Sequence, residues 1–401
     1  MSALLQELSQ WSAGRKLNLI INMHSPMDGY HRGHDKFDHD RYQVRLGRRD
    51  DLFHDRYRYS YIRFTDAFHA VVPCVTTFYV HYGPRSLDPG SLVALTAAFP
   101  NLEGINWLYR DSVHFPALRR GQMHEFASAV ASFRPPPACK TLYIYIKSQW
   151  YPHKERLPDL GSGDGTVCSA PRTMLGRSSI ERLDYEGPID PTLFWATQGA
   201  SLDADDACAW KSLREMEICF GLGLPEDRFY DKGSDVPLPP DAADLLPPGY
   251  YDSDEQNAAA VAAAKTIEMP KDDKGHIVAG CEFRWLPRDE AILPLLEAVA
   301  HRLTRTPSLR RVYLEASLPR GSGLWFFSYQ APGEVSAWDE YVEREDLACD
   351  DPMTRARVFL HAARRPNEET VARLRGIGTA LYGEDTIVTF FPLLRQFQSV
   401  K

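Results

Sequence analysis

Pro100-Asn-Leu-Glu-Gly-Ile-Asn-Trp-Leu-Tyr109 is one copy of a phrase that decides the fold of this chain. The phrase has a proline, or a residue in its place, followed by apolar residues at offsets of two, five, seven and nine. The spacing of two between the last apolar positions is the periodicity of a strand with one buried face. The five clear copies begin at Pro73, Pro100, Pro137, Lys211 and Pro307.

Apolar residues at helical spacing precede three of the copies. Asp88 and Pro89 predict a helix start, with an N-cap followed by proline at the first helical position. The stripes that follow helical periodicity are Leu92, Leu95 and Phe99; Phe126, Val130 and Phe133; and Leu296, Val299 and Leu303. Because proline cannot continue a helix, each helix is expected to end there and a strand to begin shortly afterwards.

A unit of helix, proline break and strand that recurs along a chain is typical of a stacked solenoid. The prediction is an α/β fold: a leucine-rich-repeat-like curved solenoid of helix-strand units with irregular insertions, forming a single domain over residues 1–401. The gaps between copies are 27, 37, 74 and 96 residues, so the longer ones require insertions or degenerate units. The alternative is an ordinary α/β domain whose strands happen to follow prolines.

Further elements are expected outside the five copies. Strands are predicted at 17–23, 324–329, 356–360 and 386–391, and a helix capped by Asn367 is predicted before the last of these. Three stretches are predicted to be loop-like, at 24–60, 151–190 and 231–275. The last is expected to be a disordered or loosely structured insertion and a hinge, with a short exposed helix at Ala258 to Ala264 as the alternative.

Composition indicates a soluble globular protein, with 44% hydrophobic and 25% charged residues. The net charge of −8 and the absence of long like-charge runs argue against a nucleic-acid-binding tail. Neither a signal peptide nor a membrane span is expected from the sequence. The seven cysteines are dispersed and form no CxxC pair, which indicates reduced thiols in a cytoplasmic or nuclear protein.

Four phrases carry a resemblance to a known family. They are Leu17-Asn-Leu-Ile-Ile-Asn-Met23 followed by Ser25-Pro26-Met27-Asp28-x-x-His31; Phe99-Pro-Asn-Leu-Glu103; Trp210-Lys-Ser-Leu-Arg-Glu-Met216; and Phe283-Arg284, Leu286-Pro287 and Thr306-Pro307-Ser308-Leu309. Together they resemble the large group of fungal F-box proteins with a degenerate leucine-rich C-terminal region. The resemblance implies a region that recognises protein substrates for ubiquitylation.

The start of the chain departs from that family. In the family an F-box precedes the strand that corresponds to Leu17, and it docks the Skp-type adaptor of a cullin-RING ubiquitin ligase. Only 16 residues precede Leu17 here, which is too few for that module. Two explanations stay open: the chain is a paralogue that lacks an F-box, or its sequence is truncated. In both cases the substrate-recognition region is expected to be intact, and docking to a Skp-type adaptor is doubtful without an F-box.

The main candidate for chemistry is a polar run from His31 to Asp40. His31, His34 and His39 lie among three aspartates within ten residues, and such side chains can ligate zinc or another divalent ion. A metal-dependent enzyme built on this His31–His39 loop is the alternative function. The spacing matches no standard motif, so the prediction is a non-enzymatic binding module with no cofactor and no metal.

Two other stretches have functional alternatives. Gly161-Ser-Gly-Asp-Gly165 lacks the Gly-Lys-Ser/Thr ending of a phosphate-binding loop, which favours an ordinary loop. The arginines and tyrosines between Arg41 and Arg63 are interleaved with aspartates, which favours a salt-bridged surface over a nucleic-acid site.

The predicted binding residues come from the strand phrases themselves. If the apolar positions face the core, the residues between them line the concave face of the sheet. Tyrosines on a rigid sheet offer a large contact area at low entropic cost. The predicted site is a protein-binding face formed by Tyr79, His81, Asn106, Tyr143, Tyr145, Glu217 and Tyr313.

Overall fold

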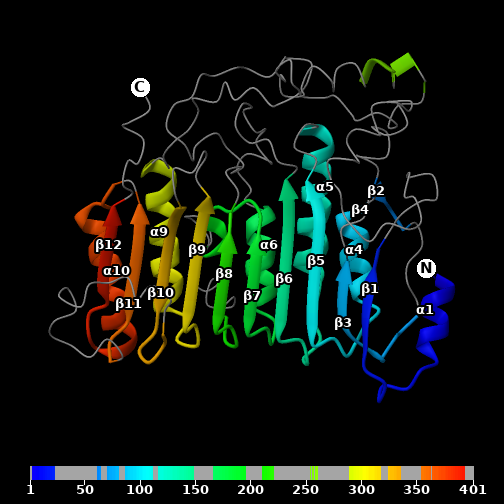
Figure 1. The fold of residues 1–401 in the computed structure, drawn as a ribbon, viewed down its shortest axis with the longest axis horizontal. Coiled ribbons are helices and arrows are strands. Elements are labelled where there is room, and N and C mark those ends of the chain that lie inside the picture. The colour runs from blue at the N-terminus through cyan, green and yellow to red at the C-terminus, as the bar shows by residue number, and fades with distance from the viewer. Residues whose placement is uncertain are drawn as a thin grey trace, which may run out of the picture.

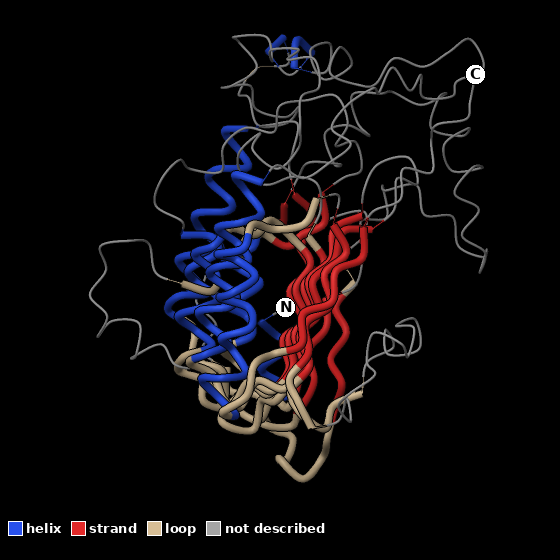
Figure 2. Tube along the Cα trace, turned by 90° about the vertical axis from the view of Figure 1, so that its left-hand side faces the viewer, coloured by secondary structure: helices blue, strands red, loops and turns tan. Residues whose placement is uncertain are grey.

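The computed structural model describes residues 2–22, 61–64, 70–80, 86–111, 116–148, 166–195, 210–220, 253, 255–256, 258–260, 289–317, 324–335, 354–362 and 364–392. These residues form a mixed α/β structure with a large, mostly parallel sheet. The helices form one layer and the strands form a second layer beside it (Figure 2).

Ten of the described strands form one sheet, and their order in the sheet is their order in the chain (Figure 1). Neighbouring strands are parallel, except that β10 is antiparallel to both β9 and β11. The strands are β1 Leu17–Ile21, β3 Val75–Val80, β5 Gly104–Asp111, β6 Thr141–Ser148, β7 Arg182–Glu186, β8 Glu215–Cys219, β9 Arg311–Ser317, β10 Leu324–Gln330, β11 Arg357–Ala362 and β12 Ile387–Pro392. Two short strands, β2 Tyr61–Ile62 and β4 Ser86–Leu87, pair separately.

The helices also follow one another in chain order. They are α1 Ser2–Ser9, α4 Pro89–Thr96, α5 Pro116–Ser132, α6 Thr166–Leu175, the 3₁₀ turn η1 Pro191–Leu193, α9 Asp289–Thr304 and α10 Glu368–Tyr382. From α4 to α10, each helix or turn contacts the next one in the series. The described parts of the chain therefore advance in one direction, with the helices on one face of the sheet.

Helix boundaries follow the capping signals of the sequence. The Asp88 carboxylate accepts a hydrogen bond from the Ser91 amide at 3.0 Å, and Pro89 follows it in the first turn of α4. Asn367 accepts a bond from the Thr370 amide at 2.8 Å at the start of α10. Gly383 ends that helix with a left-handed φ of 83°, which favours glycine. These predicted starts are confirmed.

A backbone ladder shows that the units are equivalent. The residue three positions after the start of a phrase donates its amide N–H to the carbonyl of the equivalent residue in the preceding unit. The bonds are Glu103 to Thr76 (2.7 Å), Lys140 to Glu103 (2.8 Å), Glu181 to Lys140 (2.8 Å), Arg214 to Glu181 (2.8 Å) and Arg310 to Arg214 (2.7 Å). The phrase therefore fixes the register between successive units as well as the strand within each.

The apolar positions of the phrase build the core between sheet and helices. Phe78, Ile105 and Leu142 are direct cross-strand partners and are fully buried. The same row continues through Leu183, Met216 and Val312. A single hydrophobic cluster extends from Leu5 in α1 to Ile377 in α10. Burial of apolar surface, at about 25 cal/mol per Å², is the force that stacks one unit on the next.

The prediction of a loop at 151–190 is wrong for its second half, which forms α6 and β7. A sixth copy of the phrase starts at Ser178 without proline and places Ile180, Leu183 and Tyr185 in the core. The last apolar position is Gly187, where an added Cβ would lie 3.0 Å from Cβ of Ile146. Tyr185 fills this space, and its hydroxyl donates to the Pro188 carbonyl at 2.6 Å.

The hinge expected near 231–275 is also contradicted, because β8 and β9 pair directly within the sheet. In the expected insertion, the described residues 255–256 and 258–260 are helical, and Ala260 is buried. Apart from residue 253, the rest of that stretch lies outside the described residues, and so does all of 24–60. Within the described part of the chain, no helix is both long and apolar enough to cross a bilayer.

Candidate binding face of the sheet

The face of the sheet away from the helices carries rows of side chains that cross all ten strands. Because side chains alternate along a strand, the residues between the buried apolar positions point to this opposite face. The central row follows the cross-strand register through Ile20, Tyr79, Asn106, Tyr143, Asp184, Glu217, Tyr313, Ser328, Phe359 and Thr389. We call this surface the open face.

Five of the predicted site residues lie in the central row of the open face. Tyr79 and Asn106 are direct partners, and Asn106 in turn pairs with Tyr143. Glu217 of β8 pairs with Tyr313 of β9, and both are separated from Tyr143 by β7. The sixth, Tyr145, lies one row further along β6, toward the carboxyl ends of the strands. The seventh, His81, lies outside the described residues.

The sequence reasoning missed the acidic residues of β7 and the flanking strands. Asp184 lies in the central row between Tyr143 and Glu217. In the next row, Glu186, Cys219 and Glu315 follow Tyr145 in register. Asp184 and Glu186 were missed because their segment was assigned to a loop. The alternation of Leu183 and Tyr185 with these two carboxylates is the signal that would have identified them.

These residues form an acidic-aromatic cluster, defined as Tyr143, Tyr145, Asp184, Glu186, Glu217, Tyr313 and Glu315. The rings of Tyr143 and Tyr145 are stacked, with centroids 6.3 Å apart and an interplanar angle of 10°. The hydroxyl of Tyr313 donates to Oε2 of Glu315 at 2.9 Å. The three tyrosines are half-buried, so part of each side chain is accessible to a binding partner.

The carboxylates of the cluster act on one another electrostatically. Partial burial, followed by the charge of Glu217, raises the pKa of Asp184 above its ordinary value. The nearby Arg182 and a hydrogen bond from Tyr145 oppose this shift. Burial and then the charge of Asp184 raise the pKa of Tyr145 to about 12. The cluster therefore generates a negative potential that its neighbours only partly neutralise.

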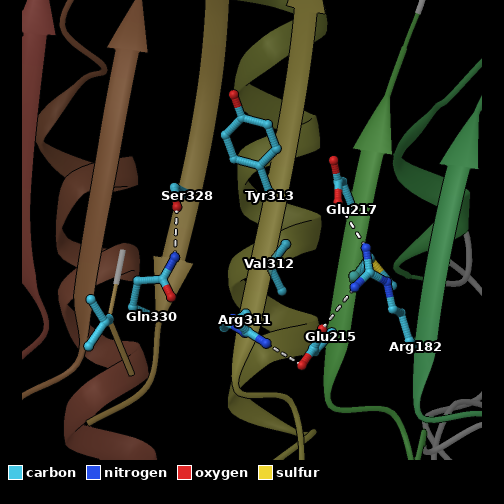
Figure 3. A pocket seen from close by; sticks show the side chains of 10 residues that line it. Arg182, Glu215, Glu217, Arg311, Val312, Tyr313, Ser328 and Gln330 are labelled. Carbon is cyan, nitrogen blue, oxygen red and sulfur yellow. Dashed lines mark hydrogen bonds and ion pairs between the residues drawn. The ribbon is translucent and has the colours of Figure 1, made fainter. Parts of the chain in front are cut away.

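A hollow of about 330 Å³ lies beside the cluster, over β7 to β10. Its floor carries an ion-pair network in which Arg182 lies 3.4 Å from Glu217 and 3.6 Å from Glu215 (Figure 3). Arg311 also pairs with Glu215. The amide of Gln330 donates to the Ser328 hydroxyl at 3.0 Å at the other side of the hollow.

The open face changes character toward β12, where it becomes apolar. Phe326 and Phe359 are buried and form a second hydrophobic cluster, separate from the main core, with Tyr313 and other half-buried apolar side chains. The rings of Phe326 and His361 lie 5.3 Å apart. Burial lowers the pKa of His361, so this imidazole is uncharged near neutral pH. The face thus has a charged, aromatic centre and, over β10 and β11, a buried apolar cluster.

Metal-ligating side chains and cysteine thiols are the other groups that could support chemistry. Within the described ranges, no group of three or more His, Cys, Asp and Glu side chains is arranged to hold a metal ion. The His31–His39 loop lies outside those ranges. Burial raises the pKa of Cys139 to about 12, and burial with the charge of Glu315 does the same for Cys219. Both thiols therefore stay protonated at neutral pH and are poor nucleophiles.

The described residues define a two-layer α/β arrangement with an elongated, mostly parallel sheet, and the described helices that pack on this sheet lie on the face opposite the open face. No protein-family model, curated protein or solved structure matches the chain.

Proposed function

We propose that this chain is a non-enzymatic recognition scaffold, a degenerate leucine-rich-repeat-like solenoid that binds a protein partner on its open face. One observation carries the proposal: helices cover one face of the sheet, while tyrosines and carboxylates line the other in continuous rows. The strands follow one another in the sheet in their chain order, which supports a solenoid. In a doubly wound sheet the strand order reverses, and ligands bind at the point of reversal.

The chemistry of the open face favours recognition. Tyrosines lose little entropy on binding and combine apolar area with a polar tip, and they are enriched in binding hot spots. The stacked rings of Tyr143 and Tyr145 are held on adjacent positions of a central strand. A rigid platform of this kind needs little reorganisation to bind a partner.

The resemblance to fungal F-box proteins suggests the kind of partner. In that family the equivalent region recognises proteins destined for ubiquitylation, in the cytoplasm or nucleus. We therefore infer that the partner is a protein substrate of this type.

Affinity capture from a cell extract, with wild-type and variant chains compared side by side, tests the proposal. Tyr143→Ala combined with Tyr145→Ala removes the aromatic pair of the open face. His124→Ala, at an exposed position of α5, is the control on the helical side. We expect the double variant to lose specific partners that the wild type and the control retain. Identical partner sets for all three chains would refute binding through the open face.

A further inference from the structure

The distribution of charge on the open face is strongly one-sided. Two adjacent rows cross β6 to β9, the first with Tyr143, Asp184, Glu217 and Tyr313, and the second with Tyr145, Glu186, Cys219 and Glu315. These eight register positions hold four carboxylates and three tyrosines, and none holds a cation. Because neighbouring strands lie about 4.8 Å apart, the carboxylates lie within each other's field.

Among the side chains that the structure describes over β6 to β9, the cations nearest the cluster lie in the row below it. Arg182 and Arg311 both pair with Glu215, and Arg182 also reaches Glu217. The distance from Arg182 to Asp184 is longer, at 3.9 Å. The two guanidinium groups are therefore largely engaged with the floor of the hollow, while Asp184, Glu186 and Glu315 extend the negative surface beyond them.

An unpartnered acceptor in the hollow is an independent sign of a missing donor. Gln330 is only 6% exposed, and its Oε1 atom is buried without a hydrogen-bond partner. Its amide nitrogen is already engaged with Ser328, so the oxygen is the free end. Gln330 lines the same hollow as Glu217 and Tyr313 (Figure 3). A buried acceptor without a partner destabilises the protein, and a bound donor would remove that cost.

Taken together, these features specify a group with several N–H donors and a positive charge. Lysine and arginine side chains have donors only, so they match a carboxylate, an amide oxygen and a tyrosine ring face at the same time. The phosphates of nucleic acids and of anionic lipids would be repelled by the same surface. A protein segment is the remaining source of such groups that suits an extended row of subsites.

We propose that the open face binds a basic, extended segment of a partner protein, with one arginine or lysine side chain entering the hollow between Glu217, Tyr313 and Gln330. This inference rests on the proposed function, because it names the chemistry of the partner at the same face. The remaining cations of the segment lie along Asp184 and Glu186, and its apolar residues extend toward Tyr143 and Tyr145.

The experiment is fluorescence anisotropy with the purified chain and two labelled peptides, one of alternating arginine and glycine and one of alternating glutamate and glycine. Three variants address the site: Glu217→Gln and Asp184→Asn remove one charge each, and Gln330→Met removes the unpartnered acceptor without changing the charge. Glu369→Gln is the matched control, because it removes one exposed carboxylate from α10 on the helical side.

We expect the arginine peptide to bind and the glutamate peptide not to bind. Each site variant should weaken binding about threefold to tenfold, as expected for the loss of one charge-assisted or buried hydrogen bond. The control should bind like wild type. Added salt should weaken wild-type binding, with a smaller salt effect in Glu217→Gln and an unchanged one in Gln330→Met.

Three outcomes would overturn the inference. They are no binding of the arginine peptide, equal weakening by Glu369→Gln, and full affinity in Glu217→Gln and Gln330→Met. If partner capture depends on Tyr143 and Tyr145 but none of the charge variants alters peptide binding, the recognition function stands and the basic segment is wrong. If neither set of variants has an effect, both proposals fail.

Discussion

Two glycines on one helix, Gly376 and Gly378, should respond in opposite directions to the same substitution. Alanine is favoured over glycine in a helix interior by about 1 kcal/mol. A Cβ built at Gly376 meets nothing within 4 Å, so Gly376→Ala should gain most of that difference. At Gly378, a Cβ would lie 2.4 Å from the Glu384 carbonyl oxygen and 2.7 Å from the Thr386 amide nitrogen. These are backbone atoms of the turn into β12, and they cannot rotate away.

The expected loss of stability in Gly378→Ala follows from the hydrogen bonds that the turn into β12 would lose. The Gly378 amide donates to the Thr386 hydroxyl at 2.7 Å, and the Thr386 amide donates to the Arg375 carbonyl at 2.9 Å. Displacement of the turn weakens both bonds, at about 1 kcal/mol each, and adds about 1–3 kcal/mol of overpacking. After subtraction of the helix-propensity gain, Gly378→Ala should destabilise the protein by about 2–4 kcal/mol.

Urea unfolding followed by circular dichroism compares the two variants with the wild type. We expect the midpoint to rise for Gly376→Ala and to fall for Gly378→Ala. Hydrogen exchange of the β12 amides shows whether the loss is local, because β12 is the last strand of the sheet and pairs only with β11 among the described strands. A Gly378→Ala variant as stable as Gly376→Ala would refute the close packing of α10 on the turn into β12.

Three further predictions concern the core, a helix cap and the open face. Thr96→Val should lower the free energy of unfolding by about 1–3 kcal/mol, because the buried Thr96 hydroxyl accepts the Trp107 indole N–H at 2.9 Å. Thr96→Ser should retain this bond, and equal stabilities of the two variants in urea would contradict the prediction. Asn367→Ala should cost about 1 kcal/mol by loss of the α10 cap, measured as a lower unfolding midpoint, whereas Asn367→Asp should be nearly neutral. Asp184→Asn should stabilise the protein at pH 7, because burial and Glu217 raise the pKa of Asp184 and so disfavour its ionised form in the folded state. The raised pKa gives wild-type stability that is fully present below the unfolded pKa and is lost as pH rises through the folded pKa. The advantage of Asp184→Asn should therefore shrink as the pH falls through the raised folded pKa and be gone below the unfolded value of about 3.9, and a constant advantage would contradict the assignment.

The Asp184 prediction connects stability with binding. Carboxylates that repel one another on a half-buried surface lower the stability of the free protein. A cationic partner would relieve that repulsion. Clusters of destabilising side chains are expected at functional sites, where residues are retained for binding although they lower the stability of the free protein.

Much of the candidate site could be predicted from the sequence because the strand phrase has a strict period. Once Phe78 and Val80 are assigned to the core, Tyr79 must point to the other face. The same reasoning placed Asn106, Tyr143 and Glu217 on the open face, and the cross-strand register joins them. The period does not tell which units are neighbours in the sheet. For this reason the predicted site lacked the strand β7, which lies between β6 and β8.

The unit at 178–187 shows what local sequence could not decide. It lacks the proline and ends in Gly187, and a search for the full phrase passes over it. In the fold, Ile146 of the neighbouring strand β6 and the hydroxyl of Tyr185 occupy the space that a side chain at position 187 would need, so their packing replaces the missing apolar residue. Asp184 and Glu186 entered the site only with this strand.

The sequence alone determined nine of the ten strands of the large sheet, the starts of α4 and α10, and the face that each residue of those strands occupies, because these depend on period, proline and capping within a few residues. The tertiary structure decided that β8 pairs with β9 across a long intervening stretch, and that carboxylates of separate strands converge beside an unpartnered Gln330. Such convergence depends on cross-strand register. Register is set by packing between units that are distant in the chain, so it cannot be predicted from the sequence pattern of one unit.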